Sequence, residues 1–192
     1  MTAEAVRMLM HEHEIILKAV RGLGDMAEVL RRGGQVDPAA LRDVVGFMRN
    51  FADTCHHAKE EALLFPALVK AGMPERDGPV AVMKGEHAQA RVCIGKLETA
   101  IHALAEGIAD APAQVATAIG CIEELYPQHI AKENNVLFPM AERLLRPAAL
   151  DGLARDFYEA ERALGEASHS YWASVAERLA SAASRATPAA TN

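Results

Sequence analysis

The sequence has few cysteines, few aromatic residues and no long apolar run. Its three cysteines, Cys55, Cys93 and Cys121, are too few and too scattered for a disulfide framework or a cysteine-rich zinc motif. We expect Cys55, next to His56, to be a small buried hydrophobic residue in a reducing compartment, with a reactive or ligating thiol as the alternative. Aromatic residues make up only 5% of the chain and β-branched residues are also scarce, so helix is favoured throughout.

Charge and hydropathy exclude further classes of protein. The formal net charge is −6 and no cluster of Lys and Arg is present, so no nucleic-acid partner is expected. No signal-type segment and no bilayer-spanning apolar stretch is found, so we expect no membrane association and a cytoplasmic location. With 192 residues, 51% of them hydrophobic, the chain can bury the core of one domain.

Glycine, proline and aspartate residues divide the chain into expected helices. Breaks fall at residues 33–38, 71–79, 107–112 and 146–147, several with an N-cap aspartate or an early proline. No alternating strand pattern occurs. The sequence therefore predicts an all-α protein, with an additional C-terminal helix over residues 147–183 and a disordered tail over residues 184–192.

One segment of the sequence occurs twice. Residues 56–66 (HHAKEEALLFP) and 129–139 (HIAKENNVLFP) share His, Ala-Lys-Glu and Leu-Phe-Pro at an offset of 73 residues. A Glu-His pair precedes each copy, at residues 12–13 and 86–87, with an offset of 74 residues. Each half of the chain thus has one lone histidine and one His-x-x-x-Glu pair. This duplication predicts a two-metal centre inside a helical bundle.

Helical periodicity predicts which of these side chains are buried. His13 and His87 interrupt the apolar seams of the first and third helices at the same level. In the fourth helix, the buried face runs through His129 and Glu133 to Val136. Phe65 and Phe138, in the Leu-Phe-Pro segments, are expected to line or cap the bundle near the site.

In the second predicted helix, the apolar face and the predicted ligands do not lie on the same side. Since neighbouring residues of a helix lie about 100° apart, His56 and Glu60 fall to one side of the apolar face, and His57 and Glu61 almost opposite. We therefore predict that His56 and Glu60 point inward and that His57 and Glu61 face solvent. A local irregularity of the helix would reconcile the upstream apolar stripe with this ligand face.

Imidazole and carboxylate ligands suit iron, manganese or zinc, and without metal such buried groups would cost several kcal/mol each. Tyr126, three residues before His129, is a candidate hydrogen-bond donor near the metals, a possible extra ligand or a packing residue. His11, His102 and His169 are expected to lie outside the site. The predicted metal ligands are His13, His56, Glu60, His87, His129 and Glu133.

Residues from about 5 to 145 resemble the hemerythrin-like family, the His-His-Glu cation-binding domains. The resemblance is carried by the two Glu-His pairs, the two His-x-x-x-Glu pairs and the doubled Leu-Phe-Pro segments. It implies an up-down-up-down four-helix bundle, here residues 1–146, that binds two iron ions through the six predicted ligands. An oxo or hydroxo bridge would join the irons. Oxygen-carrying members use five histidines, and only four are predicted to point inward here.

The expected function is binding of dioxygen, nitric oxide or peroxide at open iron positions, for sensing or stress response. The alternative is a diiron enzyme that disproportionates peroxide or repairs iron–sulfur clusters, and no catalytic residue is assigned. A metal-free helical interaction protein is disfavoured by the duplicated ligands. A homodimer or a separate signalling partner remains open as a macromolecular partner.

Overall fold

The chain is all-helical, as predicted. A computed structural model describes residues 2–165 and 168–182, and these residues include no strand. None of the helices in these two ranges is long and apolar enough to cross a membrane. The elements are α1 (Glu4–Arg31), α2 (Pro38–Phe47), η1 (Met48–His57), η2 (Glu60–Leu64), α3 (Phe65–Lys70), α4 (Pro79–Ala105), α5 (Ala111–Lys132), η3 (Glu133–Leu137), α6 (Phe138–Leu144), α7 (Pro147–Ala163) and α8 (Ser168–Ala182).

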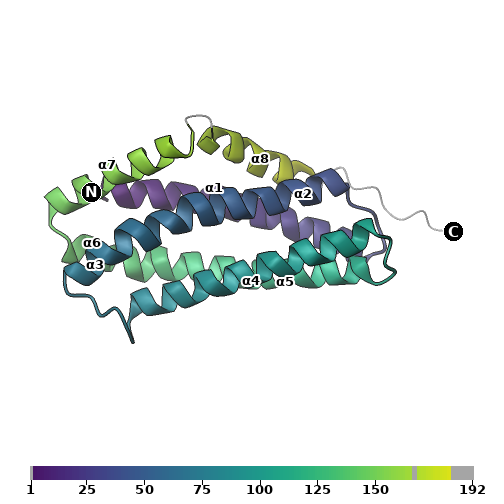
Figure 1. The fold of residues 1–192 in the computed structure, drawn as a ribbon, viewed down its shortest axis with the longest axis horizontal. Coiled ribbons are helices and arrows are strands. Elements are labelled where there is room, and N and C mark those ends of the chain that lie inside the picture. The colour runs from purple at the N-terminus through teal and green to yellow at the C-terminus, as the bar shows by residue number, and fades with distance from the viewer. Residues whose placement is uncertain (1, 166–167, 183–192) are drawn as a thin grey trace.

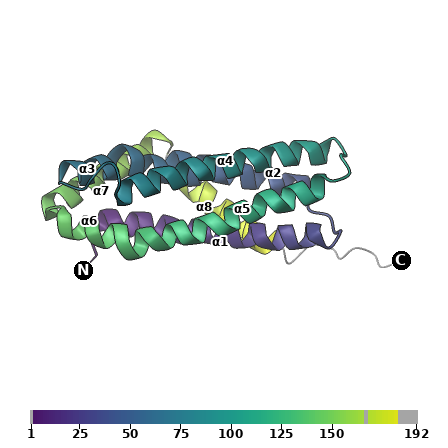
Figure 2. The same ribbon diagram turned by 90° about the horizontal axis from the view of Figure 1, so that it is seen from below.

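The long helices lie side by side along the length of the molecule (Figures 1 and 2). The segments α2, η1, η2 and α3 follow one another as one helical rod, and η3 and α6 continue α5 in the same way. Helix α5 packs against both α1 and α4. The turns that join α1 to α2 and α4 to α5 lie at one end of the molecule, and the loop between α3 and α4 lies at the other (Figure 1).

Two apolar clusters form the core, and a polar level lies between them. In α1, Leu9 belongs to one cluster and Ile16 to the other, with His13 between them. In the rod formed by α5, η3 and α6, Ile122 and Leu137 belong to different clusters in the same way. The histidines and glutamates of the repeats therefore lie at a level with packed apolar side chains on both sides.

Three stretches of helix are wound as π-helix, with i→i+5 hydrogen bonds: η1, η2 and η3. Segments η2 and η3 occupy equivalent places in the two repeats, and each ends immediately before a Phe-Pro pair. Pro66 and Pro139 lack the N–H that an α-helix would use at those positions. The irregularity expected in the second helix is thus the ten-residue segment η1, which includes His56 and ends at His57.

The C-terminal region differs from its prediction, because two helices replace the single helix expected over residues 147–183. Helix α7 ends before Gly165, whose φ of 106° is a left-handed conformation that favours glycine. Both α7 and α8 pack on α1, and α8 also packs on α2. A Cβ on Gly22 would lie 2.4 Å from the carbonyl oxygen of Leu179, so α8 and α1 approach closely there. The tail predicted over residues 184–192 lies outside the described residues.

Cys55 is a small buried residue as expected, whereas the other two cysteines form a disulfide that the sequence did not predict. Cys55 is a buried free thiol, and burial raises its pKa to about 12, which makes it a poor ligand and nucleophile. Cys93 and Cys121 form a disulfide between α4 and α5, with their Cα atoms 5.8 Å apart. The two cysteines are 28 residues apart in sequence, and the packing of α4 against α5 brings them together. In a reducing compartment the same two side chains would be thiols.

Candidate metal centre

The structure brings all six predicted ligands together at the polar level. Each side chain comes from a different turn of α1, η1, η2, α4, α5 or η3, and none is more than 3% exposed. These residues are His13, His56, Glu60, His87, His129 and Glu133.

The six side chains form two groups that share both carboxylates. His13 and His56 lie with Glu60 and Glu133 so that one ligand atom from each falls within 4.8 Å of the others. The same two glutamates form a second group of this size with the histidines of α4 and α5. Imidazole Nε2 atoms lie 3.1 Å (His13–Glu133), 3.6 Å (His56–Glu60), 3.3 Å (His87–Glu60) and 3.3 Å (His129–Glu133) from carboxylate oxygens. Two adjacent cation positions with bridging carboxylates fit this arrangement.

Six of the inward-facing ligand atoms lack hydrogen-bond partners within the described part of the chain, whereas Nε2 of His13 and Nε2 of His56 lie 2.9 Å from each other. Among the described residues, neither carboxylate oxygen of Glu60 or Glu133 has one, and neither does Nε2 of His87 or His129. A buried polar group left in this state costs roughly 1–3 kcal/mol. Metal cations would give these atoms the partners that they lack, because carboxylate oxygens and imidazole nitrogens are common metal ligands. The residues therefore fit a pair of metal ions.

A hydrogen-bond acceptor holds the outer nitrogen of every histidine in the centre. With the proton on Nδ1, the lone pair of Nε2 points inward, which is the form that binds a metal. The Nδ1 contacts are His13 to Asn134 (2.8 Å), His56 to Glu12 (2.9 Å), His57 to Asp53 (3.3 Å), His87 to Glu61 (2.7 Å) and His129 to Glu86 (3.0 Å).

The same contacts explain why the Glu-His pair and the Ala-Lys-Glu segment are both duplicated. In each half, the glutamate that precedes the lone histidine accepts hydrogen bonds from the histidine and the lysine of the following repeat. The sequence pattern identified the histidines but not this supporting role of the glutamates and lysines. The contacts join Glu12 to His56 and Lys59, and Glu86 to His129 and Lys132.

The prediction that His57 faces solvent is wrong. Its side chain is 1% exposed, and its ring stacks on that of His87 with 3.8 Å between centroids. Ligand atoms of His57, His87 and His129 lie within 4.8 Å of one another. The cause is η1, because its π winding changes the angle between successive side chains and leaves both His56 and His57 buried. The centre therefore has five buried histidines, and the expectation of four is corrected.

Glu61 was also expected to face solvent, and it lies at the edge of the centre, partly exposed. It accepts hydrogen bonds from His87 and from Arg91. Arg91 also binds Asp53, the partner of His57. Although partial burial acts to raise the pKa of Asp53, hydrogen bonds from His57 and Arg91 lower it to about 2. Asp53 is therefore an ionised acceptor at neutral pH.

Aromatic rings close the centre. Phe138 stacks on His13 with 5.4 Å between centroids, and Phe65 stacks on His87 at 5.7 Å, so both phenylalanines line the site as expected. Tyr126 is buried, and its ring lies parallel to that of His57 at 6.0 Å. Its hydroxyl has no partner among the described residues, and burial raises its pKa. His11 and His102 are exposed and His169 is partly exposed, outside the two ligand groups.

Burial also sets the protonation of the predicted ligands. It raises the pKa of Glu133 to about 8, and burial together with the charge of Glu133 raises the pKa of Glu60. Burial lowers the pKa values of His13, His56 and His129. At neutral pH these three imidazoles are therefore neutral, whereas Glu133 holds a proton that a bound metal ion would displace.

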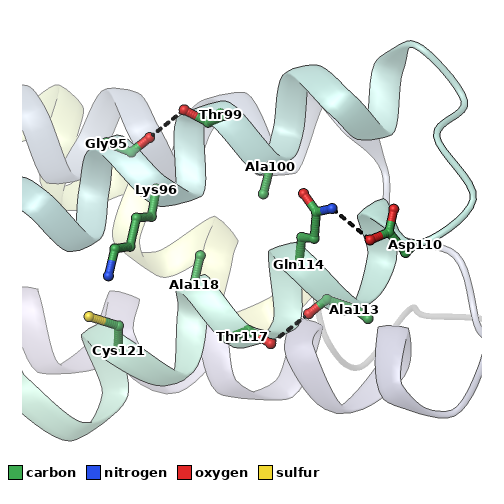
Figure 3. Close-up of a pocket in the computed structure, with 10 residues that line it drawn as sticks. All are labelled: Gly95, Lys96, Thr99, Ala100, Asp110, Ala113, Gln114, Thr117, Ala118 and Cys121. Atoms are coloured by element: carbon green, nitrogen blue, oxygen red, sulfur yellow. Dashed lines mark hydrogen bonds between the residues drawn. The ribbon is translucent and has the colours of Figure 1, made fainter.

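The six predicted ligands do not line the surface cavities found among the described residues, although one cavity reaches Glu12, the acceptor of His56. A cavity of about 630 Å³ between α4 and α5 is lined by polar and small side chains, including Thr99, Gln114 and Thr117, and it reaches the disulfide at Cys121 (Figure 3). None of the metal-centre histidines or glutamates lines it. This cavity is therefore separate from the candidate metal centre.

Several known proteins are similar to this chain in sequence. An uncharacterised protein of Mycobacterium tuberculosis is 25% identical over 160 residues, which are 83% of this chain and 62% of the relative. This chain thus spans about three fifths of the length of that relative. The iron-sulfur cluster repair protein YtfE of Salmonella newport is 37% identical over 93 residues, 45% of this chain and 40% of that protein. The family model described as the hemerythrin HHE cation binding domain matches residues 4–141. The chain therefore belongs to the hemerythrin HHE cation-binding family.

Proposed function

We propose that the chain is a diiron protein that binds dioxygen, nitric oxide or peroxide for sensing or stress response. The observation that carries the proposal is the pair of glutamates, buried and without hydrogen-bond partners, shared by two groups of histidines. The irons, joined by an oxo or hydroxo bridge, would supply open coordination positions for these small ligands. The protein scaffold is proposed to be an up-down-up-down bundle of residues 1–146. Connections at alternating ends of the molecule support that order (Figure 1).

The two metal positions have unequal sets of protein ligands. His13 and His56 would hold one ion, whereas His57, His87 and His129 would hold the other, with both glutamates shared. The first ion thus has fewer protein ligands, and we assign the open coordination position to it. A five-histidine set is the one associated above with oxygen-carrying relatives, so His57 favours ligand binding over the enzymatic alternative. Tyr126 is proposed as a hydrogen-bond donor near the metals.

The protein residues have definite tasks in this proposal. The five acceptors on Nδ1 orient the imidazoles and keep their Nε2 atoms free for metal. The apolar clusters on either side keep bulk water away from the bound ligand. We further propose that the protein acts in the cytoplasm without nucleic acid or membrane. A homodimer or a separate signalling protein is its proposed macromolecular partner.

The second candidate function is enzymatic. The similarity to a protein named for iron–sulfur cluster repair favours it, although that similarity covers less than half of either chain. Peroxide disproportionation belongs to the same class of alternatives. The open cation position required for binding would serve these reactions equally well, so the presence of an open position does not by itself separate binding from catalysis.

Metal analysis combined with anaerobic optical titration tests the proposal. Protein purified with iron supplementation and without chelators should contain close to two irons per chain. A spectrum that changes when oxygen is added to the reduced protein, and reverts when oxygen is removed, would support reversible binding. Sustained gas evolution from peroxide would support the enzymatic alternative instead. A single tightly bound iron, or none, would contradict the paired centre.

Variants of three neighbouring glutamates should separate ligands from supporting residues. We expect Glu60→Ala and Glu133→Ala each to lose at least one iron, because each removes oxygens shared by both positions. Glu61→Ala is the matched control, and it should keep both ions with affinity lowered about 10-fold, because it removes the acceptor on Nδ1 of His87 and a partner of Arg91 but no predicted ligand. Iron content after gel filtration measures the outcome. An empty Glu61→Ala protein beside a fully loaded Glu60→Ala protein would reverse these assignments.

A further inference from the structure

Each half of the centre has a glutamate that accepts hydrogen bonds from a histidine and a lysine, but the two lysines differ in their exposure to solvent. In the half built on Glu86, the side chain of Lys132 is 45% exposed. In the half built on Glu12, Lys59 is only 2% exposed, and groups from α7 and α8 contact this pair. The family match ends at residue 141, so these contacts come from a part of the chain beyond the matched domain.

The C-terminal helices make specific polar contacts with this buried pair. A carboxylate oxygen of Glu161, in α7, lies 2.5 Å from the ammonium nitrogen of Lys59. In α8, Nε2 of His169 lies 3.5 Å from Oε1 of Glu12. The other oxygen of Glu12, Oε2, accepts the Nδ1 hydrogen bond of His56 at 2.9 Å. Glu12 thus connects the C-terminal helices directly to a predicted metal ligand.

The place of a cation in this cluster is taken by the ammonium group of Lys59. Ligand atoms of Glu12, Glu161 and His169 lie within 4.8 Å of one another, but the ammonium of Lys59 contacts both carboxylates. Burial would raise the pKa of Glu12, yet hydrogen bonds from His169 and His56 and the charge of Lys59 hold it well below its ordinary value. Glu12 is therefore a permanently charged acceptor for His56.

We infer that Glu161 and His169 are positioning residues for the metal centre, through which the C-terminal helices tighten binding of the ion held by His13 and His56. The inference rests on the proposed two-metal function and adds control of one ion by a region outside the family domain. An acceptor on a ligating imidazole orients the ring and raises its basicity, and loss of such support commonly weakens metal binding 10- to 100-fold. Neither residue contacts the Glu86 half, so the effect should be confined to one ion.

The test is a cobalt titration of the metal-free full chain. Co²⁺ gives absorption bands that report each binding step, and the wild-type protein should bind two ions. His169→Ala and Glu161→Gln should each weaken one step about 10-fold and leave the other within two-fold. His169→Gln keeps a side-chain N–H that can reach Glu12, so it should restore most of the lost affinity. In NMR spectra of the cobalt protein, the shifted Nδ1–H signal of His56 should move while that of His129 stays.

Glu177→Gln is the matched control. It removes the ion pair between Glu177 and Lys18, which holds α8 against α1. This ion pair does not include Glu12. If His169→Ala and Glu161→Gln bind cobalt like this control, or if both binding steps weaken equally, the inference is wrong although the two-metal centre stands. If the wild-type chain fails to bind two ions, the proposed function fails and the inference with it. Circular dichroism of each metal-free variant confirms folding, and the isosteric Glu161→Gln keeps the test decisive should His169→Ala unfold.

Discussion

Iron-loaded protein should melt roughly 15–30 °C above the metal-free protein at pH 7.5. Metal ions that bind only the folded state stabilise it by mass action, by about 4 kcal/mol for each site when free metal is 1,000 times the dissociation constant. A protein of this size gains roughly 2–4 °C for each kcal/mol. The metal-free fold also leaves the carboxylate oxygens of Glu60 and Glu133 without partners. Scanning calorimetry of both forms would measure the difference.

The difference in melting temperature between iron-loaded and metal-free protein should shrink as the pH falls towards 5. The pKa of Glu133 is raised to about 8 from an ordinary value of 4.5, so between these values the metal-free fold holds a proton that the unfolded chain does not. The metal-free fold therefore gains stability as the pH falls through about 8, whereas bound metal must keep Glu133 ionised. His13 and His56 have folded pKa values below 6.5, so below that pH protonation favours the unfolded chain in both forms.

A Glu60→Ala, Glu133→Ala double variant is the control for this experiment. It lacks the shared ligands, so iron should change its melting temperature by no more than a few degrees. Equal melting temperatures for loaded and metal-free wild-type protein at pH 7.5 would contradict a metal centre coupled to folding. A gap that widened on acidification would contradict the raised pKa of Glu133.

Reduction of the disulfide should lower the free energy of unfolding of the metal-free protein by roughly 3–4 kcal/mol, or about 10 °C in melting temperature. Cys93 and Cys121 close a loop with a sequence separation of 28 residues, and opening it restores chain entropy to the unfolded state. Urea unfolding with and without a phosphine reductant would measure the loss. Metal-free protein is used because the reductant can also bind iron.

Cysteine variants provide matched controls for the reduction. Cys55→Ala removes the free thiol and should keep the full response to reductant. The Cys93→Ala, Cys121→Ala double variant should show none, because it has no bond to break. If wild-type protein unfolds at the same urea concentration with and without reductant, the disulfide does not form in solution.

The ligands that could be predicted from sequence are those that repeat at helical spacing. His13, His87 and the two His-x-x-x-Glu pairs follow from duplication and from a period of 3.6 residues, and all six lie in the centre. For residues in or next to a π-helix, a period of 3.6 residues does not predict which side chains are buried. Val136 was expected inside and is 50% exposed, while Leu137 is buried, because η3 changes the register after Glu133.

Supporting residues depend on contacts between helices, which a single sequence pattern does not contain. Asn134 and Glu61 occupy equivalent places in the two repeats, and each holds the lone histidine of another helix. The contact of His169 with Glu12 depends on α8, which follows α7 along α1 after the break at Gly165 (Figure 1). The sequence pattern indicated no break after Pro147 and therefore predicted one uninterrupted helix there.

The π winding of η1 has a consequence for how ligand sets diverge. A π segment accommodates about one residue more than an α-helix between the same two ends. Deleting one residue upstream of His56 would let an ordinary α-helix join α2 to the ligand pair and would return His57 to the outer face, where α-helical geometry places it. Centres with four and with five histidines are thus separated by one insertion or deletion in a helix. Such proteins could exchange ligand sets in a single genetic event without changing a histidine.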